Sequence, residues 1–114
     1  MSDCIFCKIA SGEIPTDYIY EDDRVVAFKD INPAAPVHIL IIPREHIASA
    51  LELNDSNADI AAHVFKVAGK LARDMGFAEN GFRVVNNCGK DGGQTVGHLH
   101  FHVLAGRNLG WPPG

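Results

Sequence analysis

The chain has 114 residues, of which 46% are hydrophobic, and its formal net charge is −4. This length predicts one domain covering residues 1–114, with enough apolar sequence for a core that needs no disulfides. The acidic balance excludes a surface built for long nucleic acid, because such a surface needs many cations to neutralise phosphates.

Neither membrane insertion nor secretion is expected. The sequence contains no apolar run near the ~20 residues that cross a bilayer. Its first residues, MSDCIFCK, lack the basic start and the apolar stretch of a signal peptide. Three cysteines, an odd number, are typical of reduced thiols. We therefore expect a cytoplasmic protein.

The first part of the chain predicts a short helix followed by a hairpin. Residues 4–12 place apolar side chains at helical spacing and end at a glycine. Residues 18–20 and 25–28 are strand-like and are joined by a polar turn, which favours a hairpin. Two prolines make residues 32–36 a loop, and residues 37–42 then form an almost wholly apolar strand.

The centre of the chain predicts the longest helix. Ser56 and Asp59 resemble a capping box, and Gly76 is a natural C-cap. His63 falls on the polar side among cations, so we expect an unpaired surface histidine. A second short helix is expected after His46, using Ala48, Leu51 and Leu53. The apolar face of the long helix is expected to consist of Ile60, Val64, Val67, Ala68, Leu71 and Met75.

The remaining elements complete an α+β pattern. Residues 82–86 and 98–105 are predicted strands, and a glycine-rich turn at 88–93 lies between them. Five strands with mostly hairpin-length connections, and one long helix between the third and fourth, predict an antiparallel sheet with additional short helices.

The last of these strands carries the most informative pattern. His98, His100 and His102 alternate with apolar residues, and this period of two puts the three imidazoles on one face. The first and third lie about 13 Å apart along a strand, too far for one metal ion. The row suits an extended anion better. Glycines provide close backbone approach around the polar residues Gln94 and Thr95, as a phosphate site needs.

The motif HLHFHVL at residues 98–104 resembles that of the histidine triad (HIT) family. The resemblance extends from CIFCKIASGEIP through FKDINPAAPVHILIIPREHI to the terminal GWPPG. It covers essentially the whole chain and is strongest to the Hint-type branch, the purine nucleoside phosphoramidases. It implies the HIT-like fold and a homodimer. The apolar, stiff ending Trp111-Pro112-Pro113 also favours a tail that helps to shape the partner's site.

The resemblance implies roles for four residues near the reaction. His100 matches the nucleophile, and His102 matches the donor to a phosphate oxygen. His38 matches an upstream histidine that sets the tautomer of the nucleophile, although a core imidazole bonded to a carbonyl is an equal alternative. Asp30 matches the acid that binds the ribose hydroxyls.

Further matches concern the rest of the nucleotide. The base pocket corresponds to five apolar residues, although each of them taken singly is more typical of plain core. Asn87, Gln94 and Thr95 match polar residues beside the phosphate and leaving group, with Thr95 where serine is common. The five apolar residues are Phe6, Ile9, Phe28, Ile31 and Leu40.

The sequence therefore predicts an enzyme, a hydrolase of purine nucleoside 5′-phosphoramidates that uses a nucleotidyl-histidine intermediate and no catalytic metal or organic cofactor. Retention of His102 favours hydrolysis over the family branch that transfers nucleotidyl groups. The alternatives are a dinucleoside polyphosphate hydrolase, a nucleotide-binding interaction module with vestigial catalysis, and a small zinc-dependent metalloenzyme.

Cys4 and Cys7 have a spacing common in zinc sites. A redox motif would need a thioredoxin-like βαβ setting, which this N-terminus lacks. In HIT proteins that carry the same pair, the resemblance implies that His46 and His98 complete a structural zinc site. The alternative is that both cysteines are ordinary buried small residues.

Overall fold

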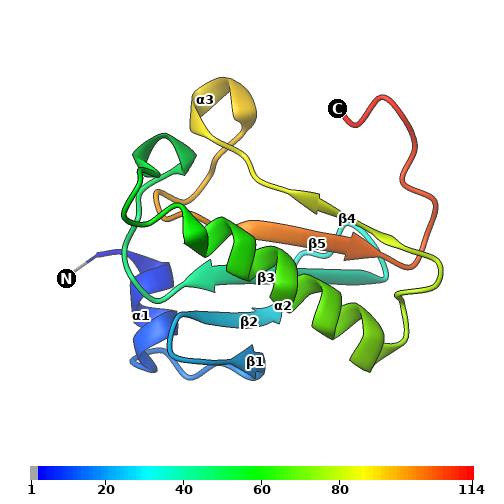
Figure 1. The fold of residues 1–114 in the computed structure, drawn as a ribbon, viewed down its shortest axis with the longest axis horizontal. Coiled ribbons are helices and arrows are strands. Elements are labelled where there is room, and N and C mark those ends of the chain that lie inside the picture. The colour runs from blue at the N-terminus through cyan, green and yellow to red at the C-terminus, as the bar shows by residue number, and fades with distance from the viewer. Residues whose placement is uncertain (1–2) are drawn as a thin grey trace.

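A twisted antiparallel sheet organises the molecule, and the computed structural model describes it over residues 3–114 (Figure 1). Its five strands lie in the order β1-β2-β3-β5-β4, and every neighbouring pair is antiparallel. The predicted α+β architecture is confirmed. The elements are α1 (Ile5–Ser11), β1 (Tyr18–Glu21), β2 (Val25–Lys29), β3 (Val37–Pro43), the 3₁₀ turn η1 (Ala50–Glu52), α2 (Asp59–Met75), β4 (Phe82–Val85), α3 (Gly89–Gly92) and β5 (Phe101–Ala105).

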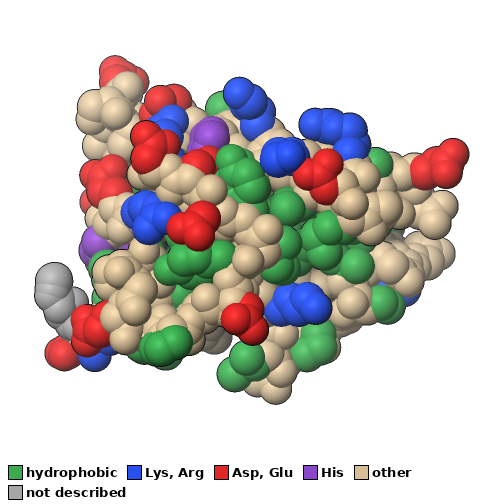
Figure 2. All heavy atoms as spheres, turned by 90° about the horizontal axis from the view of Figure 1, so that it is seen from below, with side chains coloured by type: hydrophobic (Ala, Val, Ile, Leu, Met, Phe, Trp, Pro, Cys, Tyr) green, Lys and Arg blue, Asp and Glu red, His purple; other side chains and the backbone are tan. Residues whose placement is uncertain are grey.

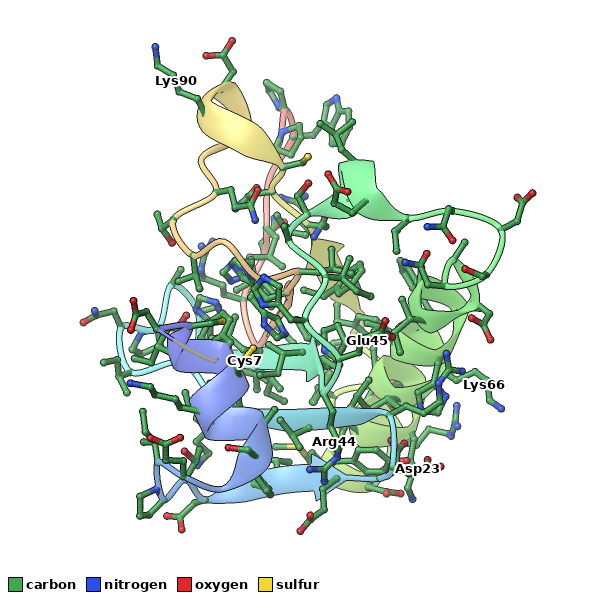
Figure 3. The ribbon with its side chains drawn as sticks, turned by 90° about the vertical axis from the view of Figure 1, so that its left-hand side faces the viewer. Cys7, Asp23, Arg44, Glu45, Lys66 and Lys90 are labelled. Carbon is green, nitrogen blue, oxygen red and sulfur yellow. The ribbon has the colours of Figure 1, made fainter. Side chains whose placement is uncertain are left out.

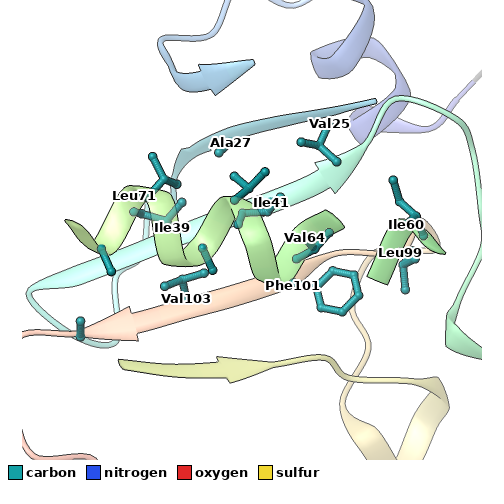
Figure 4. Packing of buried hydrophobic residues seen from close by; sticks show 14 of the residues in the cluster. Val25, Ala27, Ile39, Ile41, Ile60, Val64, Leu71, Leu99, Phe101 and Val103 are labelled. Atoms are coloured by element: carbon teal, nitrogen blue, oxygen red, sulfur yellow. The ribbon is translucent and has the colours of Figure 1, made fainter. Parts of the chain in front are cut away.

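Alternation along the central strands separates two cores. Odd-numbered residues of β2, β3 and β5, such as Ile41 and Val103, face helix α2, and even-numbered ones face the opposite side. Figure 4 shows Val64 and Leu71 of α2 packed over these strands. Helix α2 ends at Met75, and its C-cap Gly76 has a φ of 85°, a left-handed value that suits glycine.

The predicted apolar face of α2 is confirmed except at its end, since Met75 is 43% exposed. The predicted capping box is wrong. The N-cap is Ala58, which makes no side-chain cap, and the Ser56 hydroxyl donates to Oδ1 of Asn54 instead. The chain approaches α2 through a turn, so the side chain of Ser56 never reaches the first free amides of the helix.

Helix α1 covers the other face. Its buried residues Phe6, Ile9 and Ala10 pack against the even-numbered side chains of β2 and β3. The chain then leaves β3 through Arg44, whose guanidinium donates to the carbonyls of Ala10 and Asp22, both at 2.7 Å. Figure 3 shows Cys7 on α1 and Arg44 on the same side of the molecule. Arg44 therefore ties α1 and the β1–β2 turn to the sheet.

Several predicted boundaries are corrected. Strand β5 begins at Phe101, so His98 and His100 precede the ladder. Strand β3 runs one residue further, to Pro43. The helix expected after His46 is only the 3₁₀ turn η1, where Leu51 is 83% exposed and packs in no core. The backbone becomes extended at Leu53 (φ −72°, ψ 138°), and the Asn54 amide donates to Oδ1 of Asn57, so the helix does not continue.

His63 is not the unpaired surface histidine that we predicted. Its Nε2 lies 2.7 Å from Oδ2 of Asp22, which also accepts the Tyr20 hydroxyl at 2.7 Å. The other oxygen of Asp22 accepts the amides of Arg24 and Val25. Burial opposes ionisation of this carboxyl, but these hydrogen bonds outweigh it and hold the pKa of Asp22 well below its ordinary value. The contact between His63 and Asp22 joins α2 to the β1–β2 turn.

The surface seen from the β1 edge mixes acidic and basic side chains with hydrophobic ones (Figure 2). No continuous basic area is present on the described part of this face, in keeping with the net charge of −4. Among residues 3–114, no helix combines the length and the apolar character needed to cross a membrane.

Candidate functional site

The register of the sheet assembles a cavity on the α1 side. Phe28 pairs with Leu40, and Leu40 pairs with His102, so the three side chains form a row across β2, β3 and β5. Helix α1 closes one wall of the resulting cavity, which has a volume of about 450 Å³. Nine predicted residues line it: Phe6, Ile9, Phe28, Asp30, Ile31, Leu40, Thr95, His100 and His102.

Two predicted polar residues, Asn87 and Gln94, are not among the described residues that line this cavity. The Gln94 amide instead clamps the loop that precedes β5. Its Nε2 donates to the carbonyls of Ala48 at 2.8 Å and Val96 at 3.0 Å, and its Oε1 accepts the amide of Gly89. Gln94 thus holds the segment that carries Thr95.

The hydrogen bonds of His100 specify its tautomer. Its Nδ1 lies 2.7 Å from the carbonyl oxygen of His98, and a carbonyl can only accept. In the neutral ring Nδ1 therefore carries the proton, and Nε2 keeps a lone pair. The ring is 4% exposed and lines the cavity. An unprotonated nitrogen is consequently available to act as a nucleophile there.

His38 and His102 form a second set of linked tautomers. The amide of Ala34 donates to Nδ1 of His38 at 2.9 Å, so Nε2 of His38 carries the proton. That Nε2 lies 2.9 Å from Nδ1 of His102, which must accept. Nε2 of His102 is then left as a donor. Burial lowers the pKa of His102, and its neighbours His100 and His38 add to the effect, so the ring stays neutral.

Asp30 completes a chain of three polar groups with these histidines. Its Oδ2 lies 3.4 Å from Nε2 of His38, and its amide donates to the His38 carbonyl at 3.0 Å. Ligand atoms of Asp30, His38 and His102 also lie within 4.8 Å of one another. A metal needs an unprotonated nitrogen, whereas Nε2 of His38 holds a proton, so this set fits a hydrogen-bonded relay better than a cation site.

A four-residue cluster lies beside the cavity. Sγ of Cys4 is 3.3 Å from Nδ1 of His98, and Sγ of Cys7 is 3.2 Å from Nδ1 of His46 and 3.6 Å from that of His98. Bonds of about 2.0–2.3 Å to a tetrahedral Zn²⁺ separate neighbouring ligand atoms by roughly 3.3–3.8 Å. The four ligand atoms therefore fit one tetrahedral ion.

The surroundings of His98 support this fit. Its side chain is fully buried, and Nε2 lies 2.9 Å from the Pro43 carbonyl, so Nε2 carries the proton and Nδ1 presents its lone pair to the thiols. Burial lowers the pKa of His98, which keeps the ring neutral, as ligation requires. A closed four-ligand site has no open position, so an ion held there would support the fold.

Asn86 is a functional residue that the sequence interpretation missed. Its Nδ2 donates to the carbonyl of His100 at 2.8 Å, which fixes the backbone of the candidate nucleophile. Little in the sequence indicated this role. Two consecutive asparagines follow the apolar end of β4, and we assigned a role to Asn87, the second of them. Only the side-chain direction distinguishes them.

With this geometry established, comparison with known proteins identifies the family. The HIT domain matches residues 11–109. The chain belongs to the HIT family. A HIT family hydrolase from Legionella pneumophila is 48% identical with a TM-score of 0.94, over 98% of this chain and 100% of that one. A histidine triad nucleotide-binding protein from Candida albicans is 36% identical with a TM-score of 0.81, over 96% and 83%. A 14 kDa zinc-binding protein from Brassica juncea is 45% identical over 98% of this chain and all of its own length.

Proposed function

We propose that this HIT protein hydrolyses purine nucleoside 5′-phosphoramidates and releases the nucleoside monophosphate. The observation that carries the proposal is the tautomer of His100, whose unprotonated Nε2 belongs to a ring lining an apolar cavity. The names of the Legionella hydrolase and the Candida nucleotide-binding protein agree with this class of reaction.

In the proposed reaction Nε2 of His100 attacks the phosphorus, and an N–P bond to His100 forms while the P–N bond to the amine breaks. The amine leaves with the bonding electrons and takes a proton from solvent. Nε2–H of His102 donates to a phosphate oxygen on which charge increases. Water then cleaves the nucleotidyl-histidine, and the proton that it releases balances the one taken up by the amine.

The nucleotide is proposed to lie along the cavity. Phe6, Ile9, Phe28, Ile31 and Leu40 offer apolar surfaces to the flat base, and a two-ring purine uses more of them than a pyrimidine. Asp30 is proposed to accept the ribose hydroxyls. Thr95 and Asn87 are proposed to lie toward the phosphate and leaving group, with Gln94 shaping that loop.

We also propose that Cys4, Cys7, His46 and His98 bind a structural zinc, in agreement with the name of the Brassica relative. When bound, the ion would cross-link α1 to the segments after β3 and before β5. The chemistry assigned to His100 and His102 requires no catalytic metal and no organic cofactor.

A homodimer is the proposed assembly of this protein. Trp111 is 84% exposed in the single chain, and the edge strand β4 offers unpaired backbone groups to a second copy. Arg83 of β4 donates to the carbonyls of Leu109 and Gly110, which places the tail beside this edge. A second copy docked there would put each tail near its partner's site.

Mass spectrometry after brief mixing with an adenosine phosphoramidate tests the function. We expect an adenylyl adduct on His100 and production of AMP. Faster turnover of dinucleoside polyphosphates would favour the other hydrolase of this family. AMP binding without any turnover would identify a binding module. If a chelator removes zinc and abolishes turnover while the fold stays intact, the protein is a metalloenzyme.

A further inference from the structure

Helix α1 connects the four-residue cluster to the nucleotide cavity. Cys4 precedes its first residue and Cys7 lies in its first turn, while Phe6 and Ile9 of the same helix line the cavity. Phe6 lies between the two cysteines in the chain. Any movement of this turn therefore moves both a ligand pair and a wall of the cavity.

The ring of Phe6 contacts both sites. It meets the His100 ring edge-on with centroids 5.2 Å apart, and the His98 ring with centroids 5.9 Å apart. It also meets the ring of Phe28, another residue that lines the cavity, with centroids 6.0 Å apart. Such edge-to-face contacts depend on ring position, so the cavity keeps its shape only while Phe6 is held in place.

The two ends of α1 are held differently. Its C-terminal end is bonded to the rest of the protein, since the Tyr18 hydroxyl donates to the Ile9 carbonyl and Arg44 donates to the Ala10 carbonyl. The first turn is held by the Cys7 amide, which donates to Cys4 Sγ at 3.3 Å, by the contacts within the cluster and by the burial of Phe6. A helix of seven residues is too short to be stable alone, so this turn depends on the cluster together with the packing of Phe6.

The backbone around His100, the candidate nucleophile, is held by bonds outside the cysteine pair. The amide of Leu99 donates to the Ile47 carbonyl at 2.6 Å, and Asn86 donates to the His100 carbonyl. His98 is held through Nε2 by the Pro43 carbonyl. These bonds involve no cysteine, and they hold the His98 carbonyl that sets the tautomer of His100.

We propose that the cluster of Cys4, Cys7, His46 and His98 sets the affinity for the nucleotide by holding the first turn of α1, and that it leaves the reactivity of His100 unchanged. The cysteines thereby act as positioning residues for the base wall. This inference rests on the proposed function, because it takes a purine nucleotide as the ligand.

The variant Cys4→Ser tests the proposal. Serine is a strong N-cap residue, so the helix keeps its cap while the cluster loses a thiolate. We expect loss of bound zinc, a rise of about tenfold in the Kd for AMP and in KM, which corresponds to about 1.4 kcal/mol, and a kcat within about twofold of wild type. Cys88→Ser is the matched control, since Cys88 lies outside the cluster.

The measurements are zinc content by elemental analysis, AMP binding by calorimetry and amide hydrogen exchange. Exchange is expected to rise at the start of α1, where the Lys8 amide donates to the Cys4 carbonyl, and to stay constant in β5. If Cys4→Ser does not fold, wild-type protein stripped with a chelator and reloaded with Zn²⁺ provides the same comparison. Equal AMP affinity with and without zinc would overturn this inference and leave the proposed function standing. A kcat that falls together with the AMP affinity would do the same. Zinc-loaded wild type that does not bind AMP would instead overturn the proposed function.

Discussion

The two faces of the sheet are built from the same strands but serve different ends. Toward α2, sixteen of the described residues form one buried apolar cluster, to which the helix of seventeen residues itself contributes six. Toward α1, the buried apolar cluster has only seven residues, three of them from the seven-residue helix itself, and the cavity with His100 and His102 lies beside it. The short helix α1 leaves room for a ligand on its face of the sheet, whereas the long helix α2 fills the other face with side chains.

This difference separates stability from chemistry along each strand. In β5, Phe101 and Val103 belong to the core, and His102 between them belongs to the cavity. Substitutions on the α2 face should therefore change the free energy of unfolding, and those on the α1 face should change binding or turnover. The following predictions test that division, beginning with the largest effect.

His100→Ala should reduce turnover of an adenosine phosphoramidate by more than about 10³-fold, because no other nitrogen replaces the nucleophile. AMP binding should persist, since the proposed base and ribose contacts are elsewhere. Steady-state kinetics and calorimetry measure the two effects. Retention of more than a few per cent of the activity would show that another group attacks the phosphorus.

Leu71→Ala should lower the free energy of unfolding by about 2–5 kcal/mol, because it leaves a cavity in the α2 core. The kcat of the folded fraction should stay unchanged. Leu51→Ala, at an 83% exposed position, is the matched control, and its effect should stay within about 0.5 kcal/mol. Urea denaturation compares them, and equal effects of the two variants would contradict the assigned packing.

Asp22→Asn should destabilise the protein by about 1–3 kcal/mol near neutral pH, because the carboxylate accepts four hydrogen bonds there. The folded state depresses the pKa of Asp22, so its contribution is complete above the ordinary aspartate pKa of about 3.9 and is lost as the pH falls below it.

Denaturation measured from pH 7 down to pH 3 checks this sign. The difference between wild type and Asp22→Asn should shrink as the solution becomes acidic. A difference that grows toward low pH would mean that the carboxylate is not what joins α2 to the β1–β2 turn. His63→Gln offers a milder break of the same contact from the side of α2.

Deletion of residues 109–114 should have the smallest effect on stability, since Trp111 is largely exposed in the single chain. Substrate preference should change more than the free energy of unfolding if each tail shapes its partner's site. Sedimentation of the intact protein at micromolar concentration should show a dimer. A monomer would contradict both the assembly and the role of the tail.

Local pattern determined most of the fold. The apolar runs at residues 25–28 and 37–42, the alternation at residues 98–105 and the helical spacing up to Leu71 are properties of neighbouring residues. The five strands and the long helix formed close to their predicted places, whereas the helix expected after His46 did not. The left-handed caps Gly12 and Gly76 were likewise predictable, because glycine adopts positive φ without steric cost. The pairing of Cys4 and Cys7 with His46 and His98 followed from resemblance and not from any local rule.

Only the tertiary structure decided the protonation pattern of the site. Which nitrogen of His38, His98 or His100 carries the proton depends on whether an amide or a carbonyl faces it. For His98 that partner is the Pro43 carbonyl in another segment, and for His38 and His100 it is a nearby backbone group that the folded loop turns toward the ring. The contact between His63 and Asp22 spans 41 positions, and no helical periodicity contains it. Sequence period shows which face a side chain takes, whereas its hydrogen-bond partner is chosen by how distant segments pack.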